Sequence, residues 1–208
     1  MHPRWLDWAM RLQALSQSGL AFAHNPFEIE RYEAVRRIAA EMLAAGSGVP
    51  VEQVVNLFAA ESGYATPKVD VRGVVFRGNA LLLVREHADG NRWTLPGGWA
   101  DVGDTPSRSV EREVFEETGF ETRAVKVLAI YDRRRHGHMP PNPFHIYKIF
   151  FRCELIGGAA AASFETEEAT FFEEDAIPAD LSLGRVTPAQ IARMFEHLRH
   201  PDLPTDFD

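Results

Sequence analysis

Cysteine and long apolar runs are scarce in this chain. Among its 208 residues only Cys153 is a cysteine, which excludes an internal disulfide and a metal cluster built from cysteines. Cys153 ends the run 149–153, where a buried strand thiol is expected rather than a nucleophile. No segment is apolar over the length needed to cross a bilayer, and the first residues lack an apolar stretch after a basic start. We therefore expect a cytoplasmic protein without a membrane partner.

Positively charged residues are fewer than negatively charged ones. Lys and Arg number 22 against 30 Asp and Glu, which gives a net charge of −8 and a pI near 5.5. This balance disfavours broad electrostatic binding to duplex nucleic acid. An anionic small molecule is repelled as well, unless metal ions bridge it to the carboxylates. The length and the 45% hydrophobic content allow one good core plus a small second unit.

The first part of the chain has the periodicity of helices. Apolar residues recur three and four apart in three stretches, and Asn25-Pro26 with Glu28 marks the start of the second. Residues 62–67 break the pattern. We expect an all-α domain of about three helices at 1–63, a linker at 64–67 and a second domain at 68–208. The periodic positions are Trp5, Trp8, Leu12, Leu15, Tyr32, Val35, Ala39, Met42, Val51, Val54, Val55 and Phe58.

From residue 68 onward, strand patterns alternate with single helices. Residues 69–75 alternate and then turn at 77–79 into the apolar run 80–84, which predicts a hairpin. Further strands are expected near 124–130, 145–151 and 169–172, with a flexible stretch at 157–162, and a capped helix is expected to begin near Thr187. This pattern predicts an α/β domain with a mixed sheet and helices on both faces.

The most informative segment is a glycine-rich loop that leads into a helix crowded with carboxylates. Thr105 and Pro106 are typical of a helix start, and Gly119 of the position just after a helix end, which predicts a helix over 106–118. Glutamates three and four apart then share one helix face, and like-charge repulsion disfavours this grouping unless cations bind there. These glutamates are Glu113, Glu116 and Glu117.

Two interpretations of this acidic face are open. Most charge runs are simply the solvated side of a helix. Alternatively, oxygen ligands suit hard ions such as Mg²⁺ or Mn²⁺, and two such ions can clamp a phosphate that is displaced by water. The spacing of the segment favours the second interpretation, in which Glu113, Glu116 and Glu117 hold metal ions and Arg112 orients the glutamates through an ion pair.

The segment resembles the Nudix box. That pattern is Gly, five residues, Glu, seven residues, Arg-Glu, an aliphatic residue, any residue, Glu-Glu, any residue, Gly and an apolar residue. The chain departs from it once, with Asp104 where the family has its first Glu, an acid that usually supports the arginine. The resemblance implies a Nudix α/β/α sandwich, hydrolysis of phosphoric anhydrides with Glu117, Glu116 and Arg112 in catalysis, and the Gly97 carbonyl as a further metal ligand. The matched residues are Gly98, Arg112, Glu113, Val114, Glu116, Glu117, Gly119 and Phe120.

Segments outside the box indicate which subgroup of the Nudix family the chain resembles. The helical amino-terminal part together with 65–72, 131–133 and 140–148 is similar to the bacterial Nudix subgroup that includes CDP-choline pyrophosphatase and is also labelled ADP-ribose pyrophosphatase. A CDP-choline-like substrate is favoured and ADP-ribose is the alternative, with a nucleoside monophosphate and a phosphorylated fragment as products. RNA ends are a further substrate to test. An alternative of another class is a nucleotide-sensing Nudix-like regulator, which the intact glutamates disfavour.

Other candidate site residues lie outside the box. Phosphate contacts are expected from Arg72, Arg85 and Arg133, although isolated arginines more often pair with a nearby acid. An acid at the start of the 169–172 strand could act as general base, namely Glu165, Glu167 or Glu168. Three histidines close in sequence, His136, His138 and His145, could reach a substrate headgroup.

The helical domain admits two uses. Exposed apolar faces of small helical units often pair with copies of themselves, so Trp5, Trp8 and Phe27 could form a homodimer interface or cover the neighbouring site. The simpler interpretation is core packing, which we favour for Trp8 and Leu12.

Overall fold

The chain folds into two units, each with its own apolar core. The computed structural model describes residues 3–161, 163–164 and 166–208. The first unit comprises residues 1–67 and 141–145, and the second comprises 68–140 and 146–208. Along these described ranges no helix is both long and apolar enough to cross a membrane.

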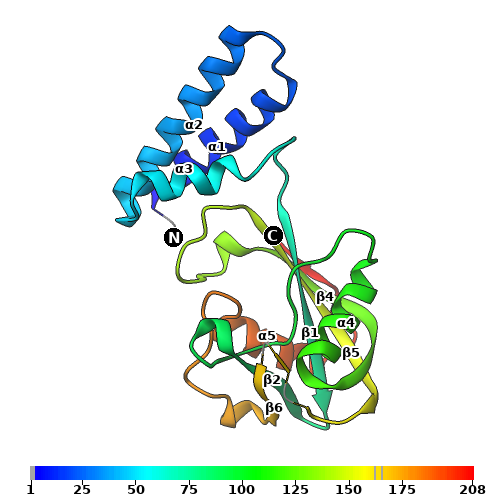
Figure 1. The fold of residues 1–208 in the computed structure, drawn as a ribbon. Helices are drawn as coiled ribbons and strands as arrows, with labels where there is room; N and C mark the ends of the chain where they lie inside the picture. The colour runs from blue at the N-terminus through cyan, green and yellow to red at the C-terminus, as the bar shows by residue number, and fades with distance from the viewer. Residues whose placement is uncertain (1–2, 162, 165) are drawn as a thin grey trace. The chain divides into compact units, whose positions relative to one another are not determined.

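The first unit is built from α1 (Arg4–Phe22), α2 (Pro26–Ser47) and α3 (Val51–Ala59) (Figure 1). The Glu28 N–H donates to the Asn25 side chain at 2.9 Å, which confirms the predicted start of α2. Phe144, from the segment that rejoins this unit, packs edge-on against Phe58 with ring centroids 6.4 Å apart. The buried core consists of Leu6, Ala9, Met10, Ala39, Ala40, Leu43, Val54 and Phe58.

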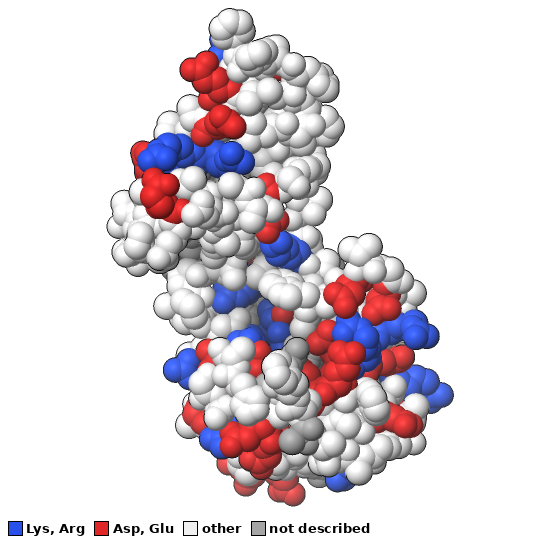
Figure 2. All heavy atoms as spheres, viewed as in Figure 1, with Lys and Arg blue, Asp and Glu red and all other residues white. Residues whose placement is uncertain are grey.

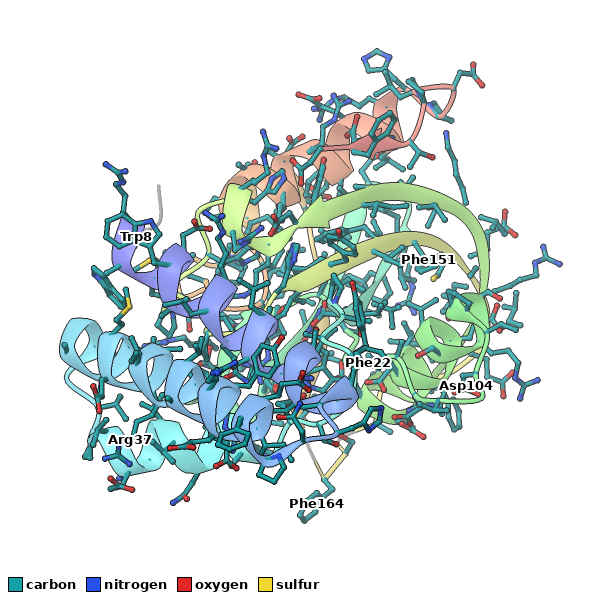
Figure 3. All side chains as sticks on the ribbon, turned by 90° about the horizontal axis from the view of Figure 1, so that it is seen from above. Trp8, Phe22, Arg37, Asp104, Phe151 and Phe164 are labelled. Atoms are coloured by element: carbon teal, nitrogen blue, oxygen red, sulfur yellow. The ribbon has the colours of Figure 1, made fainter. Side chains whose placement is uncertain are left out.

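Core packing of Trp8 is a wrong expectation. Trp8 is 46% exposed and Leu15 is 66% exposed, whereas Leu12 is partly buried. The helix has two apolar faces, and the one that is buried carries small Ala9 beside Leu6, which allows close approach between helices. Trp8 and Phe22 mark opposite ends of α1 and belong to the exposed face (Figure 3).

The second unit contains a mixed seven-stranded sheet in the order β3-β2-β1-β5-β4-β7, with β6 paired to β2. β1 pairs with β5 in parallel and forms the predicted hairpin with β2, with Phe76 opposite Leu81. The strands are β1 (Lys68–Arg77), β2 (Ala80–Glu86), β3 (Arg92–Thr94), β4 (Phe120–Asp132), β5 (Ile146–Gly158), β6 (Thr166–Phe172) and β7 (Asp206–Phe207).

One helix packs on each face of this sheet, which confirms the expected α/β class. α4 (Pro106–Thr118) buries Val110 and Val114 on one face, whereas α5 (Pro188–Arg199) buries Ile191 and Phe195 on the other (Figure 1). α4 has the predicted bounds. Its start is capped by Thr105, which accepts from the Arg108 N–H at 3.3 Å, and such a cap contributes about 1 kcal/mol.

Several short elements carry no sequence signal. They are β3, β7 and the 3₁₀ turns η1 (His87–Asp89), η2 (Arg133–Arg135) and η3 (Glu174–Ala176). β5 also continues to Gly158, into the stretch expected to be flexible. Residue 162 of that stretch lies outside the described residues. Strand extension of this kind is decided by pairing with β4, a partner distant in sequence.

Candidate active site

The glycine loop that precedes α4 is clamped to β1. The Val71 N–H donates to the Gly98 carbonyl and the Gly73 N–H donates to the Pro96 carbonyl, each at 2.8 Å. Gly97 between them has φ +136°, and a Cβ there would lie 2.1 Å from the Val71 carbonyl oxygen. Both the backbone conformation and the lack of space therefore require glycine at residue 97.

Glu117 approaches this loop from the last turn of α4. Its side chain is buried, and its Oε2 accepts the Gly97 N–H at 2.9 Å. The Thr166 hydroxyl at the start of β6 donates to the Glu117 carbonyl at 2.5 Å and fixes the end of the helix. Burial raises the pKa of Glu117 to about 8, against the opposing effect of the Arg72 charge and the Gly97 hydrogen bond.

Glu113 lies one turn earlier and also faces the loop. Its Oε2 is 2.6 Å from the point that a Cβ of Gly98 would occupy, so a side chain at Gly98 would displace it. Burial raises the pKa of Glu113 as well, against the lowering effect of Arg112. Glu116 is different, because its side chain is 56% exposed. The structure therefore brings Glu113 and Glu117 together at the glycine loop and leaves Glu116 at the surface.

Arg112 connects the acidic residues around the start of α4. Its Nη1 donates to both Glu113 and Glu116 at 2.9 Å, and its Nε donates to Asp104 at 3.1 Å. Its Nη2 lies 3.0 Å from Asp101. Hydrogen bonding to Asp104 is the first cause of a raised Arg112 pKa. The contact between Asp104 and Arg112 thus forms although Asp104 is one methylene shorter than the family's Glu. Figure 2 shows acidic and basic side chains interleaved over α4, and Figure 3 places Asp104 before the helix.

The donor set at this loop suits a hard divalent cation. Glu113 and Glu117 supply carboxylate oxygens beside glycines that leave room for an ion, and a cation would compensate the burial of Glu117. In the present side-chain conformations no three His, Cys, Asp or Glu of the described part of the chain converge on one point. Metal ligation by Glu113, Glu116, Glu117 and the Gly97 carbonyl stays a prediction.

A second buried group adjoins the glycine loop. Arg72 donates two hydrogen bonds to Asp70, at 2.9 and 2.7 Å, and a third to the Leu95 carbonyl at 3.1 Å. Lys148, opposite Asp70 in the parallel pairing of β1 with β5, donates to the same carboxylate at 2.6 Å. Sequence reasoning missed Lys148, although a lysine inside the apolar strand 146–151 was a usable signal.

The other two predicted arginines contact residues outside α4. Arg85 stacks over Trp93, with its guanidinium carbon 5.4 Å from the ring centroid, and lies 3.8 Å from Asp180. Arg133 is buried and donates to the Gly184 and Pro140 carbonyls at 3.2 and 2.9 Å. Substrate contact by either residue stays a prediction.

The candidate general bases are at the start of β6. Glu167 and Glu168 are exposed, and Glu168 accepts from the Thr170 hydroxyl at 2.9 Å. Glu165 lies outside the described residues. Sequence reasoning missed Glu86, a buried acid opposite Thr166 in the β2–β6 pairing, whose charge contributes to the raised pKa of Glu117. Glu86 is ion-paired with Arg185.

Comparison with known proteins agrees with this geometry. The model of the NUDIX domain matches residues 66–192. The chain belongs to the Nudix hydrolase family. A second model, described as the UDP-X-like N-terminal oligomerisation domain, matches residues 3–58. Together these matches cover the helical unit, the glycine loop and α4.

Several relatives share most of their length with the chain. YjhB of Bacillus subtilis, provisionally named an ADP-ribose pyrophosphatase, is 45% identical over 99% of this chain and 97% of its own. A crystal structure of a UDP-X diphosphatase has 32% identity and a TM-score of 0.63, covering 99% of this chain and 98% of that one. The crystal structure of a Streptococcus suis ADP-ribose pyrophosphatase has 38% identity and a TM-score of 0.62, covering 69% of this chain and all of that one.

Proposed function

We propose that this protein is a metal-dependent pyrophosphohydrolase that cleaves a nucleoside diphosphate linked to another moiety, at the site formed by α4 and the Gly97–Gly98 loop. The observation that carries the proposal is the placement of Glu113 and Glu117 against that loop, with Glu117 buried and hydrogen-bonded to Gly97. A buried carboxylate without a cation is costly, so its presence here favours a function over a stabilising role.

The residues of the site have separable roles. Glu113, Glu116, Glu117 and the Gly97 carbonyl would hold Mg²⁺ or Mn²⁺, which would neutralise phosphate charge and make a bound water more acidic. Arg112 fixes Glu113 and Glu116 through its fork of hydrogen bonds, and Asp104 fixes Arg112 in turn. The proton of the attacking water passes to a carboxylate, for which Glu86 joins Glu167 and Glu168 as a candidate because of its position beside Glu117.

The substrate is a nucleoside diphosphate joined to a sugar or another phosphorylated group. ADP-ribose becomes the first candidate, since two relatives bear that name and a third is a UDP-X diphosphatase. CDP-choline is the second candidate, on the resemblance of the flanking sequence.

A substrate panel tests the function. Wild type and Glu117→Gln are assayed with Mg²⁺ and with Mn²⁺ on ADP-ribose, UDP-glucose, CDP-choline, NADH, nucleoside triphosphates and 5′-triphosphorylated RNA. We expect hydrolysis of at least one nucleoside diphosphate-linked compound to a monophosphate, and a loss of about 10²-fold or more in the variant. Wild-type rates at background on the whole panel would reject the proposal.

The helical unit is proposed to form a homodimer. The exposed face of α1 carries Trp8, Leu15 and Phe22 at intervals of seven residues, which is the repeat of a helix–helix seam. The matching family model describes an oligomerisation domain. Light scattering should show a dimer for wild type and for the control Ala14→Glu, an exposed residue on another side of α1, and a monomer for Leu15→Glu. A Leu15→Glu variant with unchanged mass would exclude this face.

A further inference from the structure

The second unit holds a group of buried cations that interact with Asp70. Arg72, Lys148 and Arg133, here called the cation cluster, are each at most 5% exposed. Arg72 and Lys148 both donate to Asp70. Arg133 interacts electrostatically with Asp70 and with Lys148, which places it within the same group. Two cations thus contact the Asp70 carboxylate, and a third acts on it electrostatically.

Hydrogen bonding leaves one nitrogen of the cluster without an acceptor among the described residues. Nε and Nη2 of Arg133 donate to neutral backbone carbonyls. Its Nη1 is buried and has no partner among the described residues. A buried guanidinium nitrogen without an acceptor has lost its hydration, and no hydrogen bond offsets the free-energy cost of that loss. Burial first, and the charges of Arg72 and Arg133 as well, lower the pKa of Lys148 to about 7 in spite of Asp70.

His138 adjoins the cluster but carries no charge. Gln190 Oε1 accepts the Thr187 N–H, so its Nε2 must be the donor toward His138 Nε2, 3.1 Å away. The remaining ring nitrogen, Nδ1, then carries the proton and donates to the Leu183 carbonyl at 3.0 Å. This arrangement is possible only for a neutral imidazole. His138 therefore offers the cluster no compensating charge, and its acceptor nitrogen is already used by Gln190.

We propose that Arg133, Lys148 and Arg72 form an anion subsite that binds a phosphate group through the free Nη1 of Arg133 and the ammonium of Lys148. The inference rests on the proposed function and deepens it, because it assigns a place to one phosphate of the substrate. Arg72 links the two sites, since its charge acts on both Asp70 and Glu117. Phosphate is the expected ion, because its oxygens suit a guanidinium fork.

Binding of inorganic phosphate in EDTA tests the subsite without catalysis. Isothermal titration is carried out on the full chain for wild type, Arg133→Met, Lys148→Met and the control Arg135→Met. Arg135 belongs to the same short turn but its side chain is 68% exposed. We expect saturable binding in wild type and in Arg135→Met, and at least tenfold weaker binding in the other two variants. Arg133→Lys, which keeps the charge, should bind with intermediate strength and covers a failure of Arg133→Met to fold.

Three results would overturn the subsite: no saturable binding to wild type, unchanged binding to Arg133→Met, or an equal loss in Arg135→Met. Glu117→Gln separates this proposal from the proposed function. That variant should lose hydrolysis and keep metal-free phosphate binding. A protein that binds phosphate through Arg133 but hydrolyses nothing would retain the subsite and refute the enzyme proposal, and the opposite pattern would do the reverse.

Discussion

Replacing Glu117 with glutamine should make the metal-free protein more stable while it abolishes turnover. The side chain is buried, and its pKa in the folded state is about 8, against 4.5 for the ordinary value. Folding at neutral pH therefore requires this carboxyl to take up a proton. A glutamine is neutral at all pH values and has a carbonyl oxygen that can accept the Gly97 N–H as Glu117 does.

The magnitude follows from the displaced pKa. Because the folded-state pKa is raised, the favourable contribution is complete below pH 4.5 and is lost progressively as the pH rises toward 8. At pH 7 the cost is about 3 kcal/mol, which corresponds to a change in Tm of roughly 5–10 °C for a chain of this size. Added Mg²⁺ or Mn²⁺ should restore stability to wild type and have little effect on the variant.

Calorimetry in EDTA between pH 5 and 8, repeated with Mg²⁺, measures these differences. Glu121→Gln is the matched control, since Glu121 is exposed at the start of β4, and its stability should follow that of wild type. A Glu117→Gln protein that is less stable than wild type at pH 8, or that has the same dependence of Tm on pH, would refute a raised pKa for Glu117.

Substitutions at two other positions test the packing of the glycine loop and the charge state of His138. Gly97→Ala should cost more than about 3 kcal/mol in urea unfolding, because its Cβ meets the Val71 carbonyl, whereas Gly103→Ala, with positive φ but open space, should cost about 1–2 kcal/mol. Equal costs would contradict the argument from space. For His138, burial lowers the folded pKa to about 3 from 6.5, so the unfolded chain binds the proton first and stability should fall by about 1.4 kcal/mol per pH unit below 6.5. Acid unfolding of His138→Gln should be shifted to lower pH, and an unshifted transition would refute the buried neutral state.

Local signals predicted α4 well because each of them acts within a few residues. Thr105, Pro106 and Gly119 specify the two ends of the helix, and the observed bounds are those expected. The hairpin of β1 and β2 is equally local, since its turn joins strands that pair with each other. In contrast, β7 forms only because residues 206–207 pair with β4, and a two-residue segment contains no sequence pattern that predicts such a pairing.

The face of a helix is harder to predict than its bounds. α1 has apolar residues on two sides, and the periodicity of Trp8 and Leu15 was as regular as that of the residues that are buried. What decides burial is the partner surface, where Ala39 and Ala40 of α2 admit close packing. An apolar stripe in a helix hairpin therefore predicts burial against a partner surface. It does not distinguish a surface within the same unit from one on another chain.

The parts of the site that depend on residue spacing within one helix could be predicted from the sequence. The parts that depend on which strands pair could not. Glu113 and Glu117 are one helical turn apart, so their shared face was visible in the sequence. Glu116 was predicted on that same face, but its side chain is 56% exposed. Lys148 reaches Asp70 across the parallel pairing of β1 with β5, a contact between residues 78 positions apart. Arg72 was predicted to contact the substrate because arginines near the Nudix box can bind phosphate groups. Most of its hydrogen-bond donors are instead used inside the protein. Its bonds to Asp70 and Leu95 fix a positive charge in the cation cluster, and this charge also acts on Glu117 of α4.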